Sequence, residues 1–241
     1  MRISESSGSM GSGVSEAKAY YVRSMPRVAA LFDMDRTLVK KDTARLYTRY
    51  RRDRGEATWR DALQVGFWAM QYTFGVIDAP GVARKALAEF RGTDERALIE
   101  ACDGWFKEYV MPFVQAKGRE AVERHRAEGH VVAIVTGATK YAAGPLAKEL
   151  GIDEVVCSEL ELEDGRLSGR IIEPLCYGAG KLERAKLLAE RREFDLAEST
   201  FYSDSITDLP LLEAVRYPQV VNPDARLRRA ARQRGWPIHE W

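Results

Sequence analysis

The residues best suited to chemistry are acidic side chains that follow apolar runs. Asp33 and Asp35 come directly after the run Val28–Phe32. In an extended chain, residues i and i+2 point to the same side, so both carboxylates can face one site. A lone Asp-x-Asp pair is weak evidence, because such acids are also common in turns and helix caps. The pair therefore indicates a candidate catalytic or metal-binding position, with a turn as the alternative.

A second pair of acids, Asp204 and Asp208, follows another apolar run, Thr200–Tyr202. If Asp208 opens the next helix, it lies within reach of Asp204 and of the same edge of a sheet. The alternative is that Asp208 caps that helix, a role for which aspartate is well suited.

Three further residues have the chemistry to bind phosphate. Thr136 and Gly137 follow the run Val131–Val135 and precede a predicted helix. A hydroxyl and free backbone amides at that place can cradle a phosphate. For this motif taken alone, Thr136 as a helix cap and Gly137 as a turn residue is the more common explanation. Lys181 lies at the start of a helical segment, where the helix dipole disfavours a cation. We therefore expect it to neutralise a phosphate or a carboxylate. Its surroundings are not a nucleotide-binding P-loop, because Leu182 stands where Ser or Thr should follow the lysine.

The elements that must position these groups predict a doubly wound α/β fold. Short, continuous apolar runs are typical of strands that are buried on both faces of a parallel sheet. These runs are Val28–Phe32, Val131–Val135, Glu154–Cys157, Thr200–Tyr202 and Gln219–Val221. Helical segments alternate with the later runs; they are Arg119–Glu128, Tyr141–Leu150, Lys181–Arg192, Asp208–Val215 and Asp224–Gln233. The Asp164-Gly165 turn predicts a β-hairpin. Ligands bind at the carboxyl edge of such sheets, where the acids are expected.

The long stretch between the first and second runs contains no convincing strand. Its helical spacing predicts helices over Thr43–Arg52, Ala57–Tyr72, Pro80–Phe90 and Asp94–Phe113. A structureless loop of that length is improbable in a compact domain, which favours an inserted helical bundle. The predicted organisation is a disordered leader at 1–25, a Rossmann-like core at 26–41 and 115–241, and an all-helical cap at 42–114.

Composition excludes several other classes of protein. The net charge of +1 does not create the positive electrostatic potential that would attract a nucleic-acid partner. The three cysteines are an odd number without paired spacing, so we expect them to be reduced thiols. The chain has no apolar run of about 18 residues, so we expect no transmembrane segment. The amino terminus has no apolar core of a signal peptide, so a cytoplasmic location is expected. The oligomeric state stays open.

Several carboxylates that converge on one edge repel each other and need compensation. Oxygen-rich surroundings of this kind suit Mg²⁺. Zinc would need His or Cys ligands, and His125 and His130, which flank a predicted helix end, are expected to be solvated.

Taken together, these elements resemble the haloacid dehalogenase (HAD) superfamily of phosphatases. The resemblance is closest to its phosphoserine-phosphatase-like branch, subfamily IB, whose helical C1-type cap follows the first motif. It covers about Pro26 to Trp241, with the order of the motifs intact. It implies a Mg²⁺-dependent phosphatase that acts on a small phosphomonoester through an aspartyl-phosphate.

The resemblance also implies a role for each motif residue. Asp33 is the nucleophile and a metal ligand, and Asp35 is the general acid/base, which binds metal through its backbone carbonyl. Asp204 completes the metal site. The phosphoryl oxygens are bound by Thr136, Gly137 and Lys181, with Asp208 as a supporting residue.

The sequence departs from the family pattern at Arg36, where many relatives have glycine. Phosphoserine-specific relatives have glutamate where Asp42 aligns, so the substrate class stays open. The aromatic stretch Val65–Phe74 fits either the packed core of a cap or an apolar mouth for a lipid-like phosphomonoester. A phosphotransferase or phosphomutase, and a non-catalytic phospho-ligand-binding protein, are the alternative functions.

Overall fold

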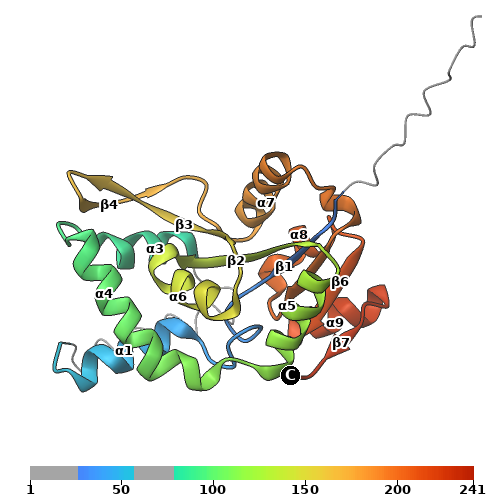
Figure 1. Cartoon of the computed structure of the whole chain (residues 1–241), viewed down its shortest axis with the longest axis horizontal. Coiled ribbons are helices and arrows are strands. Elements are labelled where there is room, and N and C mark those ends of the chain that lie inside the picture. The colour runs from blue at the N-terminus through green and yellow to red at the C-terminus, as the bar shows by residue number, and fades with distance from the viewer. Residues whose placement is uncertain (1–26, 57–78) are drawn as a thin grey trace, which may run out of the picture.

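The computed structural model describes residues 27–56 and 79–241. Their strands form one sheet in the order β4-β3-β2-β1-β5-β6-β7 (Figure 1). All neighbouring strands run parallel except β3 and β4, which form an antiparallel hairpin. The strands are β1 (Ala29–Phe32), β2 (Val131–Thr139), β3 (Glu154–Glu163), β4 (Arg166–Ile172), β5 (Thr200–Ser203), β6 (Tyr217–Val221) and β7 (Ile238–His239).

Helices occupy both faces of this sheet and one end of the molecule. They are α1 (Thr43–Asp53), α3 (Ala79–Ala88), α4 (Glu95–Trp105), α5 (Ala116–Ala127), α6 (Lys140–Leu150), α7 (Ala179–Arg192), α8 (Leu209–Leu212) and α9 (Ala225–Arg234). A π-helical turn (Phe106–Val110) and a 3-10 turn (Met111–Phe113) follow α4, and two further 3-10 turns cover Leu196–Glu198 and Ile206–Asp208. The predicted α/β class with helices inserted after the first strand is therefore confirmed.

The central strand β1 is apolar at every position because both of its faces are covered. Ala30 and Phe32 pack in a core cluster with α5 and α6, whereas Ala29 and Leu31 pack in a second cluster with α7 and α9. All four side chains are almost inaccessible to solvent. This is the physical reason why the strand lacks the alternation of a half-exposed strand.

Three of the helices between β1 and β2, namely α1, α3 and α4, gather on the left in Figure 1, away from α7, α8 and α9. Asp42 is the N-cap of α1 and Asp94 is the N-cap of α4, and each of these aspartates accepts a hydrogen bond from a backbone N–H in the first turn. Trp105 and Phe106 are buried and belong to the same core cluster as Phe32. The inserted helices therefore share a hydrophobic core with one face of the sheet.

The β3–β4 hairpin connects the sheet to the inserted helices. The backbone N–H of Gly92 donates to the carbonyl of Leu167 at 2.7 Å, and Leu167 donates to Thr93 at 2.9 Å. The Asp164-Gly165 turn, predicted from sequence, makes a third contact, since Gly165 accepts from the N–H of Glu95 at 3.0 Å.

Some predictions need correction or lie outside the described residues. The predicted helix Asp208–Val215 is shorter: α8 covers Leu209–Leu212, because the chain must turn back to begin β6 at Tyr217. The leader 1–25, the predicted helix Ala57–Tyr72 and the aromatic stretch Val65–Phe74 lie outside the described residues. Within the described part, no helix has the length and apolar character needed to cross a bilayer.

Candidate active site

The carboxyl edge of the parallel strands borders a cavity of about 400 Å³, a size typical of small-molecule sites. Asp33 follows β1 and Asp204 follows β5, the neighbouring strand. Every residue that the sequence indicated for the site lines this one cavity: Asp33, Asp35, Thr136, Gly137, Lys181, Asp204 and Asp208. The topology of the sheet thus brings together groups from four separate stretches of chain.

Lys181 is the central cation of the site. It is 4% exposed, and its Nζ donates to Oδ1 of Asp33 at 2.6 Å and to Oδ2 of Asp208 at 2.7 Å. Burial by itself would lower the pKa of Lys181, but the carboxylates of Asp208 and Asp33 outweigh it and hold the pKa above its usual value. Lys181 therefore stays charged despite its place in the first turn of α7.

Asp208 supports Lys181 rather than capping a helix. Its side chain makes no capping hydrogen bond to α8, and its Oδ2 also accepts a hydrogen bond from Oγ of Ser203 at 2.6 Å. These two donors hold the carboxylate, and through it the ammonium group of Lys181, in one orientation.

The two acids of the first motif titrate well above their usual range. Burial raises the pKa of Asp33 to about 6, with Lys181 opposing the shift. Burial, followed by the charges of Asp42 and Asp33, raises the pKa of Asp35 to about 7. The N–H of Thr43, at the start of α1, donates to Oδ1 of Asp35 at 2.7 Å, so the first inserted helix fixes this carboxyl group.

Asp204 has the most strongly raised pKa of the three acids Asp33, Asp35 and Asp204. Burial, and then the carboxylates of Asp33 and Asp208, raise its pKa to about 9. Its nearest cation is the half-exposed Arg36, whose Nη1 lies 3.9 Å from Oδ2. Crowded, buried carboxylates with too little positive charge are the donor set that a hard divalent cation prefers, so the residues fit Mg²⁺.

Arg36 adopts the left-handed backbone conformation, with φ of 56°. Its carbonyl accepts hydrogen bonds from Nδ2 of Asn222 at 3.0 Å and from Nε2 of Gln115 at 3.4 Å. The loop therefore keeps a conformation that favours glycine, and the departure from the family pattern adds a guanidinium beside Asp204.

Thr136 and Gly137 belong to β2, which continues beyond the predicted run. Thr139, not Thr136, is the N-cap of α6, so the capping explanation of Thr136 is wrong. Oγ1 of Thr136 accepts from the N–H of Ala138 at 3.1 Å. The carbonyl of Gly137 accepts from Oγ of Ser158 at 2.8 Å, which anchors this wall of the cavity to β3.

Two arginines that are not part of the motifs also line the cavity, Arg45 of α1 and Arg226 of α9. A signal was present, because Arg226 lies two residues after the N-cap Asp224, at a helix start that follows β6. Such helix starts lie at the same edge of the sheet as the acids.

Comparison with known proteins agrees with the fold. A family model for haloacid dehalogenase-like hydrolases matches residues 30–213. Phosphoserine phosphatase SerB1 of Mycobacterium tuberculosis is 33% identical over 219 residues, which cover 88% of this chain and 70% of that protein. Histidinol-phosphatase of Neisseria meningitidis is 31% identical over 215 residues, which cover 87% and 96%.

Among solved structures, a protein of unknown function from Bordetella pertussis superposes with a TM-score of 0.81 at 29% identity, covering 89% of this chain and 99% of that one. The chain belongs to the haloacid dehalogenase-like hydrolase family. Together with its phosphatase relatives, this defines the enzyme class as phosphoric monoester hydrolase.

Proposed function

We propose that this protein is a Mg²⁺-dependent phosphatase that hydrolyses a small phosphomonoester through an aspartyl-phosphate on Asp33. The observation that carries the proposal is the contact of 2.6 Å between Asp33 and the buried Lys181, in a cavity that Asp35 and Asp204 also line. A nucleophile, a proton donor and a cation are thus within one small volume.

In the first step, the Asp33 carboxylate attacks phosphorus, and the bond between phosphorus and the leaving oxygen breaks. Asp35 donates a proton to that oxygen, for which its raised pKa of about 7 is well matched near neutral pH. In the second step, Asp35 takes a proton from water as the water oxygen attacks phosphorus. The bond between phosphorus and the Asp33 oxygen breaks, which releases inorganic phosphate and restores the Asp33 carboxylate. Lys181, Thr136 and Gly137 hold the phosphoryl oxygens.

Phosphatases of this family generally use a divalent metal ion. Asp33, Asp35 and Asp204 would hold Mg²⁺ here, and the described residues that line the cavity include no His or Cys to favour a softer metal. When bound, Mg²⁺ offsets negative charge on the transferring phosphoryl group, the dominant requirement in phosphoryl transfer.

We further propose that residues 42–114 act as the cap that selects the substrate. Thr43 already contacts Asp35, and Arg45 places a guanidinium at the cavity from the same helix. No ion pair of Arg45 or Arg226 occurs among the described residues 27–56 and 79–241. Two cations without carboxylate partners favour a phosphomonoester with a second anionic group.

A panel of phosphomonoesters with and without Mg²⁺ tests the proposed function, with inorganic phosphate as the measured product. We expect turnover with Mg²⁺ and none with EDTA. Transfer of the phosphoryl group to an added alcohol, in place of release to water, would identify a phosphotransferase. Phosphoester binding without any turnover would identify a non-catalytic binding protein.

Magnesium should stabilise the protein, and more strongly at pH 8 than at pH 6. Burial raises the pKa of Asp204 to about 9, against about 3.9 in an unfolded chain. The folded state therefore holds this proton more tightly, and metal-free stability falls as the pH rises from about 4 towards 9. Mg²⁺ binds the ionised carboxylates, and at about 100 times its Kd it adds about 2.7 kcal/mol.

Thermal unfolding with EDTA or Mg²⁺ at the two pH values measures this effect. Asp204→Asn is the matched variant, because it keeps the shape of the side chain and removes its charge. We expect the variant to lose most of the Mg²⁺ shift. An equal shift at both pH values, or an undiminished shift in Asp204→Asn, would contradict the proposed metal site.

Arg45→Ala should raise KM about tenfold for phosphomonoesters with a second negative group, the loss expected for a hydrogen bond to a charged group. The KM for p-nitrophenyl phosphate, which has no second anion, should change little. Arg49→Ala is the control, since Arg49 lies on the same helix and interacts with Asp53 at 3.6 Å. An equal rise in KM for both kinds of substrate would show that Arg45 does not bind the second anionic group.

A further inference from the structure

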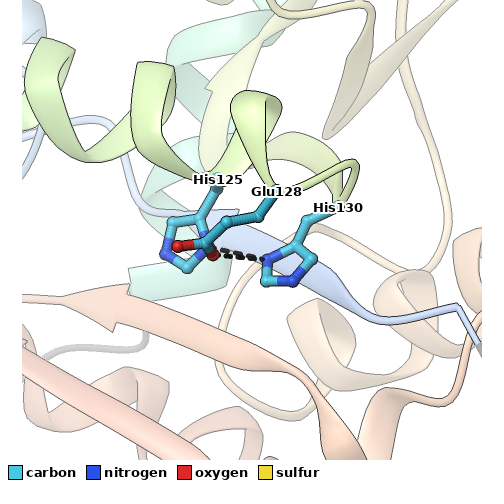
Figure 2. A group of neighbouring side chains, drawn as sticks. All are labelled: His125, Glu128 and His130. Carbon is cyan, nitrogen blue, oxygen red and sulfur yellow. Dashed lines mark hydrogen bonds and ion pairs between the residues drawn. The ribbon is translucent and has the colours of Figure 1, made fainter.

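His125, Glu128 and His130 form a cluster where α5 ends and β2 begins (Figure 2). This is the amino-terminal end of β2, whereas the cavity with Asp33 lies at the carboxyl ends of the strands. The Nδ1 atoms of the two histidines are 2.8 Å apart. Oε2 of Glu128 lies 3.6 Å from Nδ1 of His125 and 3.5 Å from Nδ1 of His130.

The expectation that both histidines are solvated is wrong for His125. It is 6% exposed, because Phe32 and Tyr202 each pack against its ring in an edge-on arrangement. His130 and Glu128 are more open, with side-chain exposures of 25% and 47%. The cluster therefore has a rigid, buried inner ligand and an accessible outer side.

We propose that His125, Glu128 and His130 bind a transition-metal ion of the zinc class, with a fourth position open to water. Donor atoms about 2.0–2.1 Å from a tetrahedral zinc ion lie about 3.3 Å from one another. The two distances to Glu128 are close to this value, and the two Nδ1 atoms must separate by about 0.5 Å. Glu128 and His130 lie near the surface, so this adjustment needs no change in the core.

The partner of the second nitrogen of His125 supports this assignment. Nε2 lies 2.9 Å from the hydroxyl oxygen of Tyr202, which also accepts a hydrogen bond from Nη2 of Arg124 at 3.0 Å. When Nδ1 binds a metal, Nε2 carries the proton and its N–H donates a hydrogen bond to the hydroxyl oxygen of Tyr202. Second ligand nitrogens are held in this way in most histidine metal sites, because the contact fixes the tautomer and the ring orientation.

The types of donor in the cluster also suit a metal of the zinc class. Two imidazoles and one carboxylate select zinc-class ions, whereas the cavity with Asp33 offers oxygen ligands for Mg²⁺.

Titration with Co²⁺ and Zn²⁺ tests the proposal, using the full chain without a histidine tag and with millimolar Mg²⁺ present. We expect one equivalent of Co²⁺ to bind and to give the strong visible absorption of tetrahedral coordination, and Zn²⁺ to displace it. His130→Ala should weaken binding by at least about tenfold, as the loss of one of the three protein ligands predicts. Thermal unfolding and phosphatase activity of this variant should match the parent protein, which shows that the fold is intact.

Two controls make the result specific. His239→Ala removes the remaining histidine, which contacts Gln219 on β6, and should leave Co²⁺ binding unchanged. Asp204→Asn, which weakens the proposed Mg²⁺ site, should also leave it unchanged. Absence of tetrahedral Co²⁺, undiminished binding in His130→Ala, or an equal loss in His239→Ala would overturn the proposal without affecting the proposed phosphatase activity.

Discussion

Asp33→Asn should lower kcat by at least about a thousandfold, a loss typical of removing a catalytic nucleophile. The amide keeps the size of the side chain but has no anionic oxygen to attack phosphorus. Lys181 keeps its second carboxylate partner, Asp208, at 2.7 Å, so we expect the folded structure to persist. The variant thus separates chemistry from folding.

Release of inorganic phosphate measures the loss, and fluoroberyllate provides an independent test, because it mimics the acyl phosphate. We expect fluoroberyllate and Mg²⁺ to raise the Tm of the parent protein and to leave Asp33→Asn unchanged. Asp195→Asn makes the same substitution at a 3-10 turn, where Asp195 accepts from the N–H of Ala197, and should keep full activity. Full activity in Asp33→Asn would refute the mechanism.

Lys181→Met should abolish turnover and also destabilise the protein by about 3–5 kcal/mol, the cost of leaving buried charges without their partner. Lys181 is the direct cationic partner of both Asp33 and Asp208, and all three side chains are buried. Methionine has a similar length, so the loss of stability comes from the missing charge more than from a new cavity. Urea unfolding measures the change in stability.

The double variant Lys181→Met/Asp208→Asn distinguishes charge from packing. Removing the carboxylate of Asp208 should restore much of the stability that Lys181→Met loses, because one of the two uncompensated acids is gone. Activity should not return, since the cation that faces Asp33 is still absent. Lys186→Met, at an exposed position of the same helix, is the control and should leave stability and activity unchanged.

If Lys181→Met were as stable as the parent protein, the buried ion pairs would not have the structural role assigned to them. An active double variant would show that the ammonium group of Lys181 is not needed for phosphoryl transfer. The first outcome concerns the fold and the second concerns the chemistry, so the two conclusions can be reached separately.

Local patterns determined the fold class and the candidate residues of the site. The continuous apolar runs before Asp33 and Asp204 are a direct consequence of strands that are covered on both faces. Parallel strands deliver their carboxyl ends to one edge, so the shared site followed from the order of the elements. The hairpin turn at Asp164-Gly165 was likewise predicted from two adjacent residues. These features depend on spacing and on short-range backbone preferences, which a single sequence contains.

Other features depended on contacts between distant segments, and only the tertiary structure decided them. His125 is buried because Phe32 and Tyr202 pack on it from β1 and β5, although the spacing around it resembles a solvated helix end. Arg45 and Arg226 reach one cavity from elements far apart in the chain. The burial and pairing of a polar side chain are set by whichever elements pack against it, and the local sequence carries no record of those partners.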